Sequence, residues 1–218
     1  MPERAVATSA TVATYDLLQP LSLPAHGAIW ASLAFADSIP VETRHIYDGV
    51  RFDRYQRNRR TDAHLGSEFS PTVETRLVFR NTTGALLPPG ELRLLRGAAD
   101  RALEWIGSDW LPPLAPGEEA TLNLGPAAGL IGRRLRTAFV DSTPFNASEE
   151  SFEITLDNQT PDDQTITVIE HLYRGDTHEI IAASADHTPG DTPHSLQFVV
   201  PVKTGSRKTI TYTVRYTW

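Results

Sequence analysis

The chain ends in Thr209-Ile210-Thr211-Tyr212-Thr213-Val214-Arg215-Tyr216-Thr217-Trp218. Large apolar or aromatic side chains occupy every second position of this stretch, and threonines with one arginine occupy the positions between them. Successive side chains of a β-strand point to opposite faces, so a period of two predicts a strand with one buried face and one polar face. The last ten residues therefore predict a β-strand, and with it the fold class.

The same alternation recurs in the residues that precede this strand. Phe152, Ile154 and Leu156 alternate with polar residues, and the turn-forming residues 157–163 follow them. Further strands are expected at residues 165–173, 178–184 and 195–202. Several short strands separated by turns are typical of a β-sandwich. We therefore predict an immunoglobulin-like β-sandwich over residues 143–218.

The first part of the chain shows the same pattern. Strands are expected at residues 10–18, 28–35, 41–48, 73–81, 91–96, 103–107, 119–124 and 130–141. Proline and glycine punctuate most gaps, which leaves no room for helices of ordinary length. One helical alternative is residues 98–106, whose helix propensity is good but whose length is marginal. The sequence thus predicts an all-β chain of two β-sandwich units in series, residues 1–142 and 143–218.

Residues 51–70 are expected to form a long, polar, arginine-rich loop inside the first unit. Arg54, Tyr55 and Arg57 belong to a cluster in which arginines alternate with aromatic residues. Such a cluster can follow an anionic chain, either RNA or an acidic polysaccharide, through charge and stacking. The alternative is a solvated loop, which the acidic charge of the whole chain favours.

Composition excludes several functional classes. The formal net charge of −7 and the pI near 5.5 argue against a nucleic-acid-binding protein. The absence of cysteine excludes disulfides, thiolate metal ligands and a cysteine nucleophile. No apolar run approaches the roughly 18 residues of a membrane-spanning helix, so no membrane span is expected. The first residues lack the apolar segment of a signal peptide, so none is expected in this chain.

Motifs of enzyme active sites are not found in the sequence. No Gly-x-Ser-x-Gly nucleophile elbow occurs. Residues 125–132 hold three glycines, but Pro126 and the lack of a following Lys-Ser/Thr do not fit a phosphate-binding loop. Acidic neighbours such as Glu149 and Glu150 would point to opposite faces of a strand rather than at one substrate. We therefore predict no catalytic residue and no cofactor.

A metal site is not expected either. The seven histidines show none of the spacings that bind zinc. His171, His178 and His187 have acidic neighbours and would be the first ligands to test if they converged. The oxygen-rich residues 157–163 lack the spacing of a calcium-binding EF-hand loop. These residues are better interpreted as surface histidines and a solvated turn.

Tryptophan supplies the remaining candidates for a contact site. Trp105 and Trp110 flank a short Gly-Ser-Asp segment, which favours their exposure near a turn. An exposed tryptophan can stack on a sugar or anchor a protein interface. Trp30 and Trp218 fall in predicted strands and are expected to be core residues or thinly covered strand ends.

Residues 76–84, Arg-Leu-Val-Phe-Arg-Asn-Thr-Thr-Gly, are followed by Leu-Pro-Pro-Gly-Glu-Leu-Arg-Leu at residues 87–94. This pair of segments resembles the C-terminal domain of mucoidy-inhibitor-A-like bacterial proteins, a domain of unknown function. Residues 152–158 and 211–218 are similar to later strands of the same family. The matching residues are strand and turn residues, so the resemblance implies an all-β domain but no catalytic set. It also implies a periplasmic or cell-envelope location.

Together these observations favour a non-catalytic β-sandwich module that mediates protein or glycan contacts in a bacterial envelope-associated system. One alternative is a carbohydrate-active hydrolase whose carboxylates come from distant loops, roughly 5 to 9 Å apart in a cleft. Another is a structural spacer, which would lack a sizeable exposed apolar or aromatic patch. Trp105, Trp110, Arg54, Tyr55 and Arg57 are the candidate contact residues.

Overall fold

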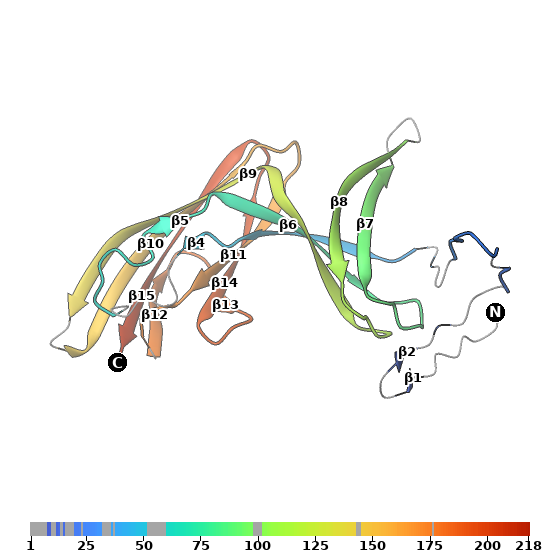
Figure 1. The fold of residues 1–218 in the computed structure, drawn as a ribbon. Helices are drawn as coiled ribbons and strands as arrows, with labels where there is room; N and C mark the ends of the chain where they lie inside the picture. The colour runs from blue at the N-terminus through green and yellow to red at the C-terminus, as the bar shows by residue number, and fades with distance from the viewer. Residues whose placement is uncertain are drawn as a thin grey trace. The chain divides into compact units, whose positions relative to one another are not determined.

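The structure, a computed structural model, describes residues 8–9, 12–13, 15, 20–22, 24–31, 36, 38–51, 60–97, 102–142, 145–175 and 177–218. Within these ranges the secondary structure is all-β, as predicted (Figure 1). Most strands belong to one large mixed sheet of nine strands. Three further sheets have two strands each: β1 with β2, β4 with β5, and β7 with β8.

The nine strands of the large sheet follow one another in space as β12 (Thr177–Ala183), β15 (Ser206–Thr217), β10 (Ala147–Asn158), β9 (Glu119–Ser142), β6 (Thr72–Arg80), β3 (Val41–Tyr47), β11 (Gln164–His171), β14 (Ser195–Val202) and β13 (Thr188–Pro189). β3 and β11 run parallel, whereas β10 runs antiparallel to both β9 and β15. The small sheets pair β1 (Thr8–Ser9) with β2 (Val12–Ala13), β4 (Val50–Arg51) with β5 (Glu68–Phe69), and β7 (Gly90–Gly97) with β8 (Leu103–Leu111).

The chain divides into two compact units that are not consecutive in sequence. Unit 1 holds residues 1–43 and 77–124, and unit 2 holds residues 44–76 and 125–218. β3, β6 and β9 each contribute residues to both units. This division differs from the predicted units, residues 1–142 and 143–218. On either side of residue 142, β9 and β10 pair antiparallel with each other, from Ser142 opposite Ala147 to Leu130 opposite Asn158.

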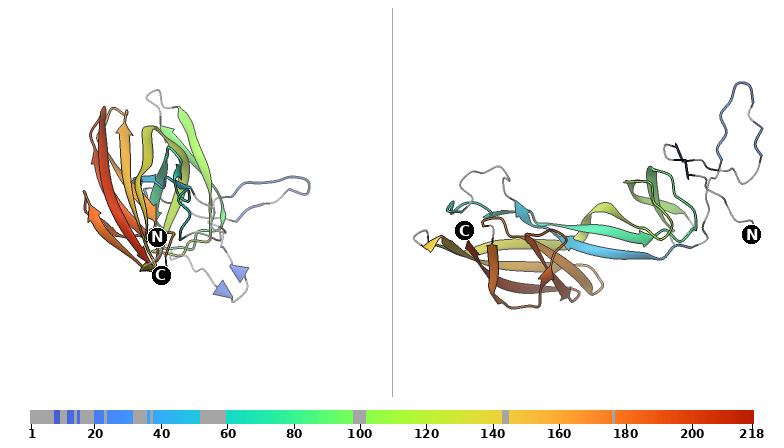
Figure 2. Two further views of the ribbon diagram at one scale, coloured as in Figure 1. Left: turned by 90° about the vertical axis from the view of Figure 1, so that its left-hand side faces the viewer. Right: turned by 90° about the horizontal axis from the view of Figure 1, so that it is seen from below.

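The core of unit 2 is built from the alternating positions that the sequence indicated. Ile154 of β10, Val168 of β11, Phe198 of β14 and Val214 of β15 have no exposed surface and belong to one cluster. The rings of Phe198 and Tyr212 lie 5.7 Å apart, which brings β14 against β15 across this core. Figure 2 shows the strands of this unit from two further sides.

Unit 1 has its own, smaller core. Its buried members are Phe79, Leu111, Leu114, Ala120 and Leu122, which come from β6, β8, β9 and the segment after β8. The inward side chains of β7 pack against this cluster. The hairpin of β7 and β8 is therefore anchored to unit 1 by one of its faces.

One turn occurs in both units with the same hydrogen bonds. The Asn81 amide donates to the carbonyls of Ala85 and Leu114 at 2.8 and 2.9 Å, and its oxygen accepts from the amide and hydroxyl of Thr83.

In unit 2, Asn158 donates to the carbonyls of Asp162 and Val202 and accepts from both groups of Thr160. Both Asn-x-Thr segments are therefore turns that a buried asparagine holds at a strand end, as the sequence indicated.

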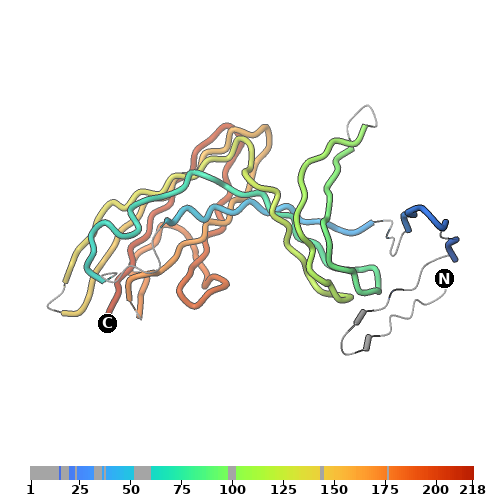
Figure 3. Tube along the Cα trace, in the orientation of Figure 1, coloured from blue at the N-terminus to red at the C-terminus, as the bar shows by residue number. Residues whose placement is uncertain are grey.

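Several predicted elements differ in the structure. The strands expected at residues 119–124 and 130–141 form one strand, β9, of 24 residues, which can be followed as a single trace in Figure 3. Gly125 and Gly129 adopt positive φ values of 85° and 80° inside it, a conformation that glycine takes at little cost. The loop predicted between those strands is wrong, because the glycines change the backbone locally without ending the pairing of β9.

The strand predicted at residues 103–107 is confirmed as part of β8, so the helical alternative does not hold for residues 103–106, while residues 98–101 lie outside the described residues. The expectation for Trp30 was wrong. Trp30 is 101% exposed, and residues 28–31 form no strand, so Trp30 is not a core residue. Trp218, in contrast, packs against the core of unit 2.

Candidate functional site

The β7–β8 hairpin of unit 1 exposes a group of apolar side chains that includes the predicted tryptophans. Trp105 and Trp110 are 63% and 66% exposed, and both lie on β8. Leu95 lies directly opposite Trp105 in the antiparallel pairing, and Leu103 lies opposite Gly97. These two leucines are 53% and 68% exposed. Leu95, Leu103, Trp105 and Trp110 are called the hairpin patch below.

Two charged pairs lie on the hairpin, one on each face. Arg93 contacts Glu91 at 2.9 Å, and Glu91 lies opposite Trp110, so this pair shares the face of the hairpin patch. Arg96 of β7 contacts Glu104 of β8 at 2.6 Å, on the other face, because both residues alternate with patch residues along their strands. These exposed ion pairs contribute little to stability, about 0–1 kcal/mol each. The hairpin patch therefore has one charged pair beside it on its own face.

Three further contact residues were predicted in the arginine-rich loop. Arg54, Tyr55 and Arg57 lie in residues 52–59, outside the described residues. The second part of the arginine-rich loop is described, and it lies on unit 2. There hydrogen bonds from Arg134, Arg136 and Arg174 are accepted by the carbonyls of Asp62, Ala63, Leu65 and Gly66.

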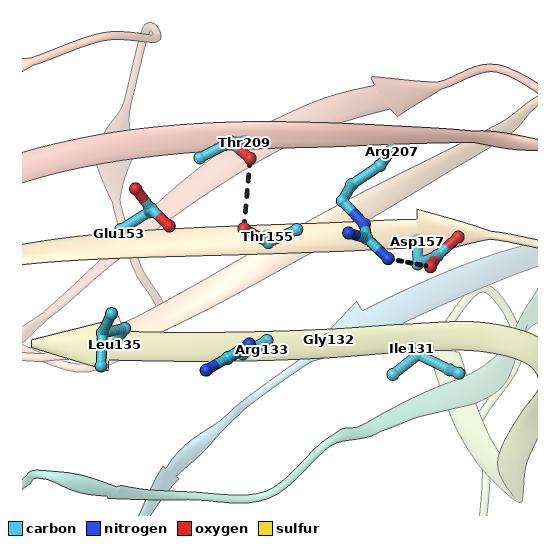
Figure 4. A pocket seen from close by; sticks show the side chains of 9 residues that line it. All are labelled: Ile131, Gly132, Arg133, Leu135, Glu153, Thr155, Asp157, Arg207 and Thr209. Carbon is cyan, nitrogen blue, oxygen red and sulfur yellow. Dashed lines mark hydrogen bonds and ion pairs between the residues drawn. The ribbon is translucent and has the colours of Figure 1, made fainter.

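A second surface feature is a hollow on the polar face of the large sheet, in unit 2. Its volume is about 430 Å³. The side chains around it come from three neighbouring strands, β9, β10 and β15 (Figure 4). Its lining consists of Ile131, Gly132, Arg133, Leu135, Glu153, Thr155, Asp157, Arg207 and Thr209.

The strand register arranges these side chains in three rows. Asp157 lies between Ile131 and Arg207, and Thr155 lies between Arg133 and Thr209. In the third row, Glu153 lies between Leu135 and Thr211. Neighbouring rows are about 6.6–6.8 Å apart, because they are two residues apart along each strand.

Two of the rows hold an internal contact, and two charged groups have none. Arg207 Nη2 lies 2.9 Å from Asp157 Oδ2, and the hydroxyls of Thr155 and Thr209 are 3.1 Å apart (Figure 4). Within the described part of the chain, the guanidinium of Arg133 and the carboxylate of Glu153 make no hydrogen bond or ion pair. Both groups are therefore available to a ligand in the hollow.

The two fully buried carboxylates of unit 2 have structural partners. Glu170 accepts hydrogen bonds from Arg134 Nε at 2.9 and 3.0 Å and from the Tyr212 hydroxyl at 2.5 Å. The Arg134 guanidinium lies 3.9 Å from the centre of the Phe152 ring. Burial raises the pKa of Tyr212 well above its usual value, and the negative charge of Glu170 raises it further.

Glu150 belongs to a second buried group. It accepts hydrogen bonds from Arg174 Nη2 at 2.7 Å and from Arg136 Nη1 at 3.1 Å. The Tyr173 hydroxyl lies 3.4 Å from the same oxygen, and burial raises the pKa of Tyr173 to about 12. Glu150 and Glu170 have no exposed surface, so neither carboxylate is accessible to a substrate from solvent.

The histidines named in the sequence lie in separate surroundings. His171 Nε2 lies 3.1 Å from both carboxylate oxygens of Asp48. His178 lies edge-on against His194, and burial followed by the charge of His194 lowers the pKa of His178. His187 is exposed, and its ring lies 5.8 Å from that of the core residue Phe198. Across the described ranges, no three His, Asp or Glu side chains gather in a way that could hold a metal ion.

The described residues contain no helix of the length and apolarity needed to span a bilayer. Comparisons of the chain with protein-family models, with curated proteins and with solved structures found no match. The resemblance to mucoidy-inhibitor-A-like proteins thus stays a prediction.

Sequence reasoning missed the hollow entirely. On β10 and β15 its residues fall on the polar positions that alternate with the core residues, whereas on β9 the apolar Ile131 and Leu135 face it. A search for charged and hydroxyl residues on the outward positions of adjacent strands could have indicated it. Such a search needs the pairing of β9, β10 and β15, which brings Ile131 and Arg207 into one row with Asp157.

Proposed function

We propose that this chain is a non-catalytic binding module that contacts a protein partner through the hairpin patch. The observation that supports this proposal is the exposure of two tryptophans and two leucines on one hairpin. Exposed apolar groups of this kind mark interaction sites, and tryptophan is enriched among the residues that contribute most to binding. A structural spacer would not need such a patch.

A protein partner is favoured over a glycan at this hairpin. Sugar rings stack on the flat faces of tryptophans, which Trp105 and Trp110 provide. Leu95 lies directly opposite Trp105, however, and a leucine offers no flat face for stacking. Trp and Leu side chains side by side are better matched by apolar side chains of another protein.

The proposal includes two finer expectations. One is that each unit is an immunoglobulin-like β-sandwich, which the separate cores and the matching Asn-x-Thr turns support. The other is that the partner belongs to a bacterial envelope-associated system, which rests on the family resemblance. The alternative of a hydrolase has weaker support, because Glu150 and Glu170 are buried and bound to arginines.

The experiment uses the full chain with a photo-crosslinking residue in place of Ser108, between the two tryptophans. A protein crosslinked at this position is then purified, and its dissociation constant for the unmodified chain is measured. The variant Trp105→Ala/Trp110→Ala should weaken this binding by at least about 30-fold, the loss of about 2 kcal/mol that is expected when even one of the two tryptophans dominates the contact.

Trp30→Ala is the matched control, because Trp30 is an exposed tryptophan outside the hairpin. Its dissociation constant should equal that of the unmodified chain. The proposal is wrong if the double variant binds the purified partner as tightly as the control does. If the double variant keeps its affinity for the protein but no longer binds a glycan that the unmodified chain binds, the glycan alternative is favoured.

A further inference from the structure

The charges around the hollow on β9, β10 and β15 cancel. Arg133 and Arg207 carry positive charges, and Glu153 and Asp157 carry negative ones. An inorganic anion would face both carboxylates, and a metal cation would face both guanidinium groups. The hollow is therefore matched to a ligand without net charge.

The free polar groups of the hollow require a ligand that both accepts and donates hydrogen bonds. Arg133 only donates, and the ionised Glu153 only accepts. A hydroxyl group does both, since it carries one donor and two acceptor sites. The Thr155 and Thr209 hydroxyls in the middle row already contact each other and keep further hydrogen-bonding capacity. A ligand with several hydroxyl groups meets all of these requirements.

The strand β9 adds an apolar surface beside the polar groups. Ile131 and Leu135 flank Arg133 on the same face and are 44% and 46% exposed. The C–H groups of a sugar ring can pack on such aliphatic side chains while its hydroxyls reach the polar rows. The volume of about 430 Å³ lies within the range of about 300–1,000 Å³ that is usual for small-molecule sites.

We propose that this hollow is a binding site for a neutral saccharide. Arg133 donates to ligand hydroxyls, and Glu153 accepts from them. Asp157 and Arg207 close one end through their ion pair, and Ile131 and Leu135 contact the ring. The site lies within unit 2 and does not depend on the protein contact proposed for the hairpin of unit 1.

The test titrates the full chain, labelled with ¹⁵N, with three neutral disaccharides, maltose, cellobiose and chitobiose, at millimolar concentrations. Glucuronic acid serves as the charged comparison. At least one neutral disaccharide should shift the amide signals of Arg133, Thr155 and Thr209 in a saturable way. The same titration with Arg133→Gln and with Glu153→Gln should show an affinity about tenfold lower, because each variant loses a charge-assisted hydrogen bond.

Arg215→Gln is the matched control. Arg215 lies on the same polar face of β15 but pairs with Glu149, away from the hollow. Its affinity should match that of the unmodified chain, and the thermal midpoints of all variants should agree. The proposal is overturned if none of the three disaccharides binds, or if Arg133→Gln and Glu153→Gln bind as well as the control. It is also overturned if only glucuronic acid binds and Glu153→Gln strengthens that binding, since this outcome identifies an anion site.

Discussion

Arg134 of β9 and Glu170 of β11 form an ion pair inside the core of unit 2, with Nε and Oε2 2.9 Å apart and no exposed side-chain surface. The Arg134 guanidinium also donates to the carbonyl of Gly66 at 2.6 Å. The pair therefore joins two strands and the end of the arginine-rich loop at one point. Both charges are buried away from water, so the loss of either partner would leave the other charge buried without a counter-ion.

Replacing Glu170 with glutamine should lower the free energy of unfolding by about 3–5 kcal/mol, because it leaves the Arg134 charge buried without a counter-ion. Urea unfolding followed by circular dichroism measures this change. The variant Glu149→Gln is the comparison, since Glu149 pairs with Arg215 at the surface. Its cost should be about 0–1 kcal/mol. Equal losses in the two variants would contradict a structural role for the buried pair.

The chain should lose stability as the pH rises above about 10. Burial raises the pKa of Tyr47, Tyr173, Tyr212 and Tyr216, that of Tyr173 to about 12. The unfolded chain releases these protons near pH 10, whereas the folded chain keeps them. The contribution of these tyrosines to stability is thus fully present below pH 10. Above pH 10, each of them lowers the free energy of unfolding by about 1.4 kcal/mol per pH unit, until the pH reaches its pKa in the folded chain.

Urea unfolding between pH 9 and pH 11.5 measures this slope. Tyr173→Phe should remove the contribution of one tyrosine from this slope and lower the stability at pH 8 by about 0.5–1.5 kcal/mol, because the hydroxyl no longer donates to the Leu65 carbonyl or to Glu150. A slope that does not differ between this variant and the unmodified chain would show that Tyr173 ionises in the folded state.

The two matching turns should depend on their asparagines. Asn158→Ala removes the donor to the carbonyls of Asp162 and Val202, and Asn81→Ala does the same in unit 1. Each variant should lose about 1–3 kcal/mol of stability, since buried carbonyls then lack partners. Thr121→Ala, at an exposed position of β9, should change stability by less than about 0.5 kcal/mol. Calorimetric melting of the three variants provides the comparison.

Deletion of residues 210–218 should abolish folding. Ile210, Tyr212, Val214 and Tyr216 are all buried and would be removed together. At roughly 1.5–3 kcal/mol for each side chain, the loss is about 6–12 kcal/mol, comparable with the stability of a whole domain. Thr211→Lys, on the exposed face of the same strand, should cost about 0.5 kcal/mol. A truncated chain that still melts cooperatively would be evidence against this role.

The sequence predicted much of the fold because a period of two identifies the buried face of a strand. The buried residues Ile210, Tyr212, Val214 and Tyr216 are the alternate positions of the quoted C-terminal stretch. The continuity of β9 was not predicted, because Gly125, Pro126 and Gly129 are local signals for a loop. The structure nevertheless continues β9 through these residues, and its neighbours in the sheet are β6 and β10, which a local signal does not reveal.

The candidate sites were predictable only in part, for the same reason. Trp105 and Trp110 flank a Gly-Ser-Asp segment that was interpreted as a turn, and this local pattern indicated their exposure correctly although residues 107–109 lie inside β8. The contact between Arg207 and Asp157 joins residues 50 positions apart, and the one between Arg134 and Glu170 joins residues 36 positions apart. Composition and spacing do not encode such pairs until the strand order is known.

The passage of β6 and β9 from one unit to the other has a consequence for gene design. Along the sequence, unit 2 is interrupted between Arg76 and Gly125 by residues 77–124, which belong to unit 1. These residues are therefore an insertion in the sequence of unit 2. A shortened gene that encodes residues 44–76, a brief connecting turn and residues 125–218 would retain every residue of the larger core, both buried carboxylates with their arginines, and the whole hollow. The hairpin patch would be absent from its product, so a single recombinant protein separates the saccharide site from the protein contact.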